Sequence, residues 1–155
     1  MLFAAIYPWF GLLLTVVVCG GAFLRGGREE QLAASGLLMS WAVTIALRDR
    51  SWIGTQWSAF GADTCLLLLL TAISLRTGRY WPLVAAGFQL LCVVTHVAKV
   101  VDPGVRAWAY ATAQVIWSQL VFVALGVGVW NTWREGRQPA SAADDPIADP
   151  GATRR

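Results

Sequence analysis

Five long apolar stretches constrain this chain of 155 residues more than any other feature of its sequence. An α-helix rises about 1.5 Å per residue, so about 20 apolar residues are needed to cross about 30 Å of hydrocarbon. The sequence therefore predicts an all-α fold, a polytopic transmembrane helical bundle that forms one domain over residues 1–133. The five expected spans are residues 2–24, 31–47, 59–75, 82–101 and 107–130.

Composition agrees with this class of protein. Hydrophobic residues make up 57% of the chain and charged residues only 14%, whereas a soluble domain carries about 25% charged residues. Arginine in short loops supplies most of the net charge of +3. That distribution suits topology signals and anionic headgroups and argues against nucleic acid as a partner. The preference for Arg over Lys, with abundant Ala and Gly, is typical of GC-rich bacteria, so we expect a bacterial inner membrane.

Two regions qualify the count of spans. Segment 31–47 is the shortest, at the lower limit of about 17 residues for a span, and the bundle has four spans if it does not cross. Residues 134–155 are rich in Pro, Ala and Asp, which predicts a disordered C-terminal tail. No basic residue precedes the first apolar segment, so we expect a retained helix rather than a signal peptide.

The basic residues of the loops predict an orientation. With five spans, the loops after the first and third spans lie on the same side as the C-terminus. The excess of basic residues on that side, six against four, predicts a periplasmic N-terminus and a cytoplasmic C-terminus. The first group is Arg25, Arg28, Arg76, Arg79, Arg134 and Arg137, and the second is Arg48, Arg50, Lys99 and Arg106.

Segment 82–101 holds the only histidine and the only lysine of the chain. Helical periodicity divides the segment into two faces. The polar face should meet protein or water, and the apolar face should meet lipid or packed neighbours. The polar face consists of Ala85, Gln89, Cys92, His96 and Lys99, and the apolar face of Val84, Leu91, Val94, Ala98 and Val101.

Polar residues of four expected spans should lie at one depth. Residues equidistant from the turn between two antiparallel helices lie at similar depth. Asp63 lies 15 residues before Gly78 and His96 lies 18 residues after it. Counting from Gly104 brings residues of the last span to the same level. The sequence therefore predicts a ligand-binding or buried polar cluster in the outer half of the membrane, made of Asp63, His96, Gln114, Tyr110, Gln89 and Thr44.

Three interpretations of Asp63 and His96 remain open. A hydrogen bond between them ties two helices together, as interhelical bonds commonly do. Alternatively, they bind a ligand or handle a proton, because ionisable groups inside a membrane are functional candidates. In the third interpretation Asp63 caps the start of its own helix and never meets His96.

The remaining motifs limit the chemistry. A single histidine excludes a bis-histidine haem within one chain, but a five-coordinate tetrapyrrole, a quinone hydrogen-bonded by His96 or a haem shared across a dimer stays possible as a cofactor. No metal-ligand set, phosphate loop or catalytic triad is present. Lys99 should extend toward the headgroups, and Trp81 should anchor at the interface. Ala124 and Gly128 form a pair suited to close helix packing.

Three functions are compatible with these patterns. The first is a non-enzymatic subunit or scaffold of a membrane complex, in which the polar cluster holds the helices of the chain together by hydrogen bonds. The second is a quinone- or tetrapyrrole-binding membrane module that uses His96. The third is a small oligomeric transporter or proton-coupled channel that uses Asp63. The expected partners are the lipid bilayer and either further copies of the chain or other membrane subunits.

Overall fold

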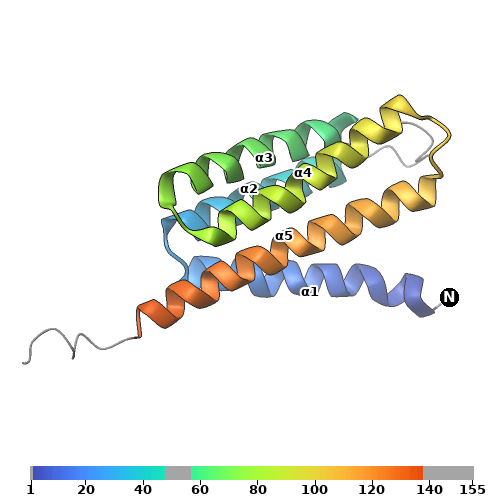
Figure 1. Ribbon diagram of the computed structural model, residues 1–155. Helices are drawn as coiled ribbons and strands as arrows, with labels where there is room; N and C mark the ends of the chain where they lie inside the picture. Colours follow the sequence, from blue (N-terminus) through green and yellow to red (C-terminus); the bar gives the residue numbers. More distant parts are fainter. Residues whose placement is uncertain (1, 48–56, 138–155) are drawn as a thin grey trace, which may run out of the picture.

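The computed structural model describes the backbone of residues 2–47 and 57–137, with side chains from residue 11 onward. Within these ranges the chain folds into five α-helices without any β-strand, which confirms the expected all-α bundle (Figure 1). The helices are α1 (Leu2–Arg25), α2 (Arg28–Leu47), α3 (Trp57–Thr77), α4 (Tyr80–Val101) and α5 (Ala107–Glu135).

Each helix coincides with an expected span, and the boundaries differ by a few residues. α2 has 20 residues because it begins at Arg28, so the segment that was weakest in the sequence is long and apolar enough to cross a membrane. α3, α4 and α5 also meet that condition, and residues Gly11–Arg25 of α1 form a shorter apolar helix. α5 continues to Glu135, so the first residues of the expected tail are helical. Residues 138–155 lie outside the described residues.

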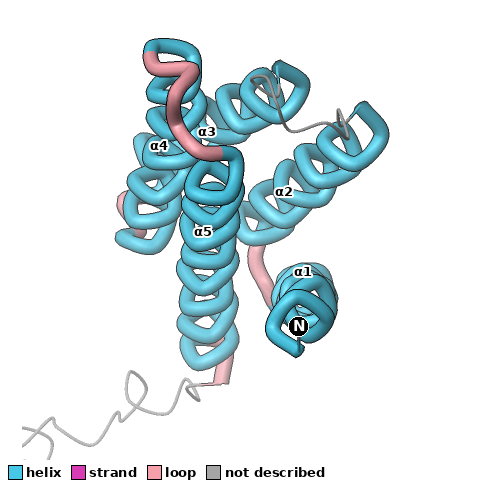
Figure 2. The backbone as a smooth tube through the Cα atoms, turned by 90° about the vertical axis from the view of Figure 1, so that its right-hand side faces the viewer, coloured by secondary structure: helices cyan, strands magenta, loops and turns pink. Residues whose placement is uncertain are grey.

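The helices run back and forth and pack as a closed ring. Each helix contacts its neighbours in the sequence, and α1 closes the ring against α5 (Figures 1 and 2). One end of the bundle, the Gly78 end, holds the α1–α2 turn, the α3–α4 turn and the end of α5. The opposite end, the Asp102 end, holds the α4–α5 loop. Gly78 has φ 61°, a left-handed conformation that glycine adopts without a Cβ clash.

The interior of the ring is filled mainly by apolar side chains, among them the fully buried Leu70, Phe122 and Leu125. The two faces of α4 separate as the sequence predicts. Every residue of its polar face is buried, and every residue of its apolar face is exposed. The polar face of α4 therefore points into the protein, where its side chains must find partners.

Close packing at the Gly78 end depends on a glycine. Gly128 of α5 is buried, and a Cβ atom built on it would lie 2.6 Å from Cδ2 of Trp81. Ala124, one turn earlier, is also buried. The expected close contact at the Ala124–Gly128 pair is therefore present, and its partner is the indole ring of Trp81.

The outer surface of the bundle is strongly apolar. Large hydrophobic side chains stay exposed on all five helices, with Leu24 84%, Leu75 82% and Val101 77% accessible. A soluble monomer rarely exposes apolar patches on this scale. The apolar surface and the lengths of the helices are compatible with a helical membrane protein that contacts lipid.

Candidate functional site

A buried chain of three side chains connects three helices near the Asp102 end. Asp63 Oδ2 of α3 lies 3.0 Å from Nε2 of His96 in α4. Oη of Tyr110 in α5 lies 2.6 Å from Nδ1 of the same imidazole. His96 and Tyr110 are each only 1% exposed. The structure therefore brings Asp63 and His96 into direct contact, and the interpretation in which Asp63 merely caps its own helix is excluded.

The hydrogen-bond partners of His96 fix the role of one of its two ring nitrogens. A neutral imidazole carries one donor nitrogen and one acceptor nitrogen. A carboxylate only accepts, so Nε2–H donates to Asp63, whereas the hydroxyl of Tyr110 can donate to Nδ1 or accept from Nδ1–H. The role of Nε2 follows from its partner.

The other residues of the predicted cluster lie around this chain. Gln89 Nε2 donates to the backbone carbonyl of Asp63 at 3.2 Å, and Gln114 Nε2 donates to the backbone carbonyl of Cys92 at 3.2 Å. Thr44 reaches the same region from α2, where it lines a pocket beside Asp63. All six residues predicted from the sequence therefore gather in one part of the bundle. Whether they bind a ligand stays a prediction.

The pocket beside the chain has a volume of about 130 Å³ and lies between α2, α3, α4 and α5. Asp63, His96 and Tyr110 form part of its wall, and Thr44 and Gln114 form another part. The side chain of Asp63 keeps 20% of its surface exposed. The pocket is therefore the one place in this cluster where a charged group meets open space.

Neither a tetrapyrrole nor a quinone fits this arrangement. An axial haem ligand needs a free ring nitrogen, and both nitrogens of His96 are already bonded. A cavity of about 150 Å³ accommodates benzene, so a pocket of about 130 Å³ is too small for either group. In the described part of the chain, no three His, Cys, Asp or Glu residues are placed to hold a metal ion.

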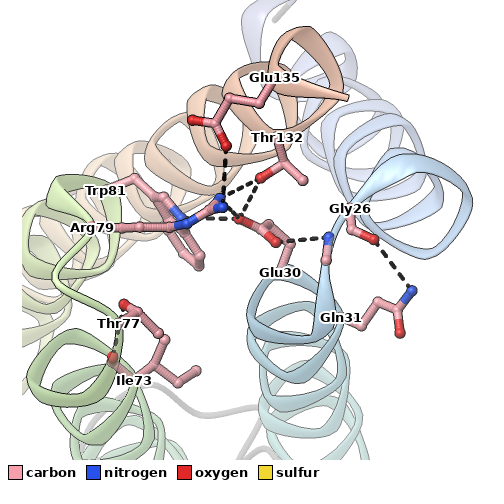
Figure 3. A network of polar contacts seen from close by, with 10 residues as sticks. Gly26, Glu30, Gln31, Ile73, Thr77, Arg79, Trp81, Thr132 and Glu135 are labelled. Atoms are coloured by element: carbon pink, nitrogen blue, oxygen red, sulfur yellow. Dashed lines mark hydrogen bonds and ion pairs between the residues drawn. The ribbon is translucent and has the colours of Figure 1, made fainter. Parts of the chain in front are cut away.

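A second buried polar cluster, which the sequence analysis missed, lies at the Gly78 end (Figure 3). Its centre is Glu30 in the first turn of α2, whose side chain is 0% exposed. Glu30 Oε1 accepts hydrogen bonds from Arg79 at 3.2 Å, from Trp81 Nε1 at 3.1 Å and from Thr132 at 3.0 Å. Glu30 Oε2 accepts from the backbone N–H of Gly27 at 2.8 Å.

The Glu30 cluster joins the helix ends at the Gly78 end. Arg79 precedes α4 and also bonds to Thr132 and Glu135 of α5, so one guanidinium connects α2, α4 and α5. The expected role of Trp81 as an interface anchor is wrong, because its ring is 6% exposed and its N–H is bound to Glu30. Glu30, which lies just before the expected span 31–47, begins the buried face of α2 with Ala33, Ala34 and Leu37.

The expectation for Lys99 is also wrong. Its side chain does not extend to the headgroups but is buried, with only 6% of the residue exposed. Its Nζ donates to the carbonyls of Pro103 at 3.0 Å and Val105 at 2.6 Å. Lys99 therefore fixes the α4–α5 loop, where backbone carbonyls that leave the helix need donors.

Comparisons with known proteins add nothing to these observations: no protein-family model, curated protein or solved structure matches this chain. The interpretation rests on the geometry of its own residues.

Proposed function

We propose that this chain is a small, non-enzymatic, multi-pass protein of a bacterial inner membrane that serves as a subunit or scaffold of a membrane complex. The observation that carries this proposal is the use of the buried polar groups. Both nitrogens of His96 and both oxygens of Glu30 are bonded to other helices or turns of the bundle. The groups best suited to acid–base chemistry thus hold the helices together.

The N-terminus is proposed to be periplasmic and the C-terminus cytoplasmic, on the basis of the excess of arginine at the Gly78 end. In this orientation the Glu30 cluster lies near the cytoplasmic surface, and the chain of Asp63, His96 and Tyr110 lies in the outer half of the bilayer. Cysteine accessibility tests this orientation directly. A cysteine at the exposed position Gly78 should react with a membrane-impermeant thiol reagent only after the cells are broken.

The outer face of α3 is the surface we expect to meet another copy of the chain. α3 contacts only α2 and α4 within the bundle. Its exposed residues recur at steps of four and three, the spacing of a coiled-coil seam, and three of them are small enough for close helix approach. The residues are Gly61, Cys65, Leu68, Ala72 and Leu75.

Crosslinking through Cys65 tests the proposal. Cys65 is exposed, whereas Cys19 and Cys92 are buried, so a short thiol crosslinker in native membranes should act at Cys65. We expect a product of twice the chain mass of 16.8 kDa that disappears in Cys65→Ser. A mass measurement on the uncrosslinked detergent complex should also exceed one chain. A monomer in both experiments would contradict self-association through α3 and would leave other membrane subunits as the proposed partners.

The pocket beside Asp63 favours a second candidate, a small oligomeric transporter or proton-coupled channel that uses this carboxylate. A carboxylate that is 20% exposed inside a membrane protein is a candidate for binding a transported solute or proton. Proton flux into liposomes that contain the purified protein tests this candidate. A flux that falls severalfold in Asp63→Asn would support it, and equal flux in empty liposomes would exclude it.

A further inference from the structure

The pocket of about 130 Å³ beside Asp63 has walls from four different helices. Ser40, Trp41 and Thr44 come from α2, and Ala59 from the start of α3. The remaining wall includes the polar face of α4 and the first half of α5. A site that four helices build together has a fixed shape, so it can discriminate between ligands.

Asp63 supplies the one carboxylate among the described residues that line the pocket. Asp63 Oδ2 accepts from Nε2–H of His96, but no described residue forms a hydrogen bond to Asp63 Oδ1. No lysine or arginine is among the described lining residues, and the nearby Lys99 is held by two loop carbonyls. A carboxylate in a poorly solvated site attracts a cation strongly because little water screens the interaction.

Hydrogen-bond acceptors converge on the same space. Thr15, Thr64 and Thr95 donate to the carbonyl four residues earlier in their own helices. Ser40 and Thr44 make no such bond in the described structure, although both line the pocket. The carbonyl oxygen of the Gln114 side chain is also without a described donor, because only Nε2 of that side chain is bonded.

The rest of the wall is apolar or aromatic. Trp41 and Tyr110 contribute rings, and Ala59 and Cys92 contribute apolar surface. Aromatic faces attract cations, with tryptophan the strongest of them. A ligand that matches this wall therefore combines a positive charge that donates hydrogen bonds with a short alkyl group.

We propose that this pocket binds a small organic cation, a protonated primary amine of about five heavy atoms. The ammonium group would bind Asp63 Oδ1 and the oxygens of Ser40 and Thr44, and the alkyl chain would lie against Trp41. The size follows from the volume, because a cavity of about 150 Å³ is filled by benzene. The inference goes beyond the proposed subunit role and does not depend on it.

Isothermal titration calorimetry of the full chain in a neutral detergent tests the site. The probe is n-butylammonium chloride, with 1-butanol as the uncharged analogue of the same size and sodium chloride as the control for ionic strength. We expect saturable binding of butylammonium at one site, no measurable binding of butanol and no displacement by equimolar sodium.

Two variants locate the site. Asp63→Asn keeps an oxygen for His96 but removes the charge, so butylammonium should bind about tenfold more weakly or worse. Thr44→Val removes one acceptor without touching the Asp63–His96 contact and should weaken binding about two- to tenfold. Asp102→Asn, which changes an exposed carboxylate of the α4–α5 loop, should bind as the wild type does.

Any one of three results would refute the proposal: the wild type does not bind butylammonium, butanol binds equally well, or binding is unchanged in Asp63→Asn. Displacement by equimolar sodium would mean that the site takes an inorganic cation. If Asp63→Asn does not fold, Thr44→Val decides, because unchanged binding in that variant removes the hydroxyl from the site and refutes the proposal.

Discussion

Each of the two buried polar clusters contains one carboxylate, but the two carboxylates differ in exposure and in hydrogen bonding. Glu30, at the Gly78 end, is 0% exposed and both of its oxygens accept hydrogen bonds from within the bundle. Asp63, toward the Asp102 end, is 20% exposed, and only one of its oxygens has a side-chain partner in the described structure. Both oxygens of the first carboxylate are bonded, whereas the second carboxylate lines a pocket and has one oxygen without a described partner.

This difference separates a structural tie from a binding site. A buried carboxylate is tolerated when donors and a cation compensate for its lost hydration. At Glu30 the cation is Arg79, which belongs to the chain itself. At Asp63 the described residues provide an imidazole but no lysine or arginine that contacts the carboxylate, so we expect a cation from outside to complete the site. The predictions below test whether the two ends differ in this way.

Glu30→Gln should have the largest effect on stability. The amide leaves Arg79 without its buried counterion and turns an N–H₂ group, itself a donor, toward donors that a carboxylate oxygen had accepted from. We expect the free energy of unfolding to fall by about 3 kcal/mol, measured from helicity during titration with sodium dodecyl sulfate. The control is Glu29→Gln, one residue earlier and without a described side-chain hydrogen bond. Equal losses in the two variants would refute the role of Glu30 as a tie.

Gly128→Ala should cause the second-largest loss of stability, because the new Cβ would lie 2.6 Å from the Trp81 ring. Overpacking of this kind costs about 2 kcal/mol. Gly87→Ala, in the interior of α4, is the matched control because nothing lies within 4 Å of its added Cβ. That variant should be neutral or up to about 1 kcal/mol more stable, since alanine favours the helix. The same detergent titration distinguishes the two.

Lys99→Met should cost about 1 kcal/mol, because the carbonyls of Pro103 and Val105 lose their donor. Thermal unfolding in detergent is sufficient to detect the change. Arg106→Met, at an exposed position of the same loop, should have no effect. A lysine that merely reached the headgroups would behave like Arg106, so equal results for both variants would contradict the buried position of Lys99.

Asp63→Asn should be the least destabilising of these changes, with a loss below about 1 kcal/mol. The asparagine oxygen can still accept from His96, and its amide can face the pocket. The comparison with Glu30→Gln is well matched, since both variants replace a carboxylate by its amide. A loss in Asp63→Asn as large as that in Glu30→Gln would show that Asp63 is also a structural tie.

The sequence predicts the His96 region well because that region follows periodic rules. Helical spacing places Gln89, Cys92 and His96 on one face of α4, and counting from Gly78 brings Asp63 to the depth of His96. Both inferences need only a regular helix and a short turn. The contact with Tyr110 follows from the next turn in the same way.

The Glu30 cluster could not be found by the same rules. Its members lie at helix ends and turns, where residues such as Arg79 and Thr132 are distant in sequence and are brought together only by the closure of the ring. A charged residue near a turn ordinarily faces water, so Glu30 lies outside the expected span 31–47, and a tryptophan beside a turn is expected at the interface. The available signal was the spacing of Glu30 with Ala33, Ala34 and Leu37 along one helical face.

The most direct test of the account is the stabilisation of the bundle by butylammonium, measured for the wild type and for the two amide variants. At about 100 times the dissociation constant of the wild type, a ligand of the folded state raises the free energy of unfolding by about 2.7 kcal/mol. We predict this increase for the wild type and for Glu30→Gln, but not for Asp63→Asn. An equal increase in all three proteins, or none in the wild type, would contradict the distinction between a closed tie at Glu30 and an open site at Asp63.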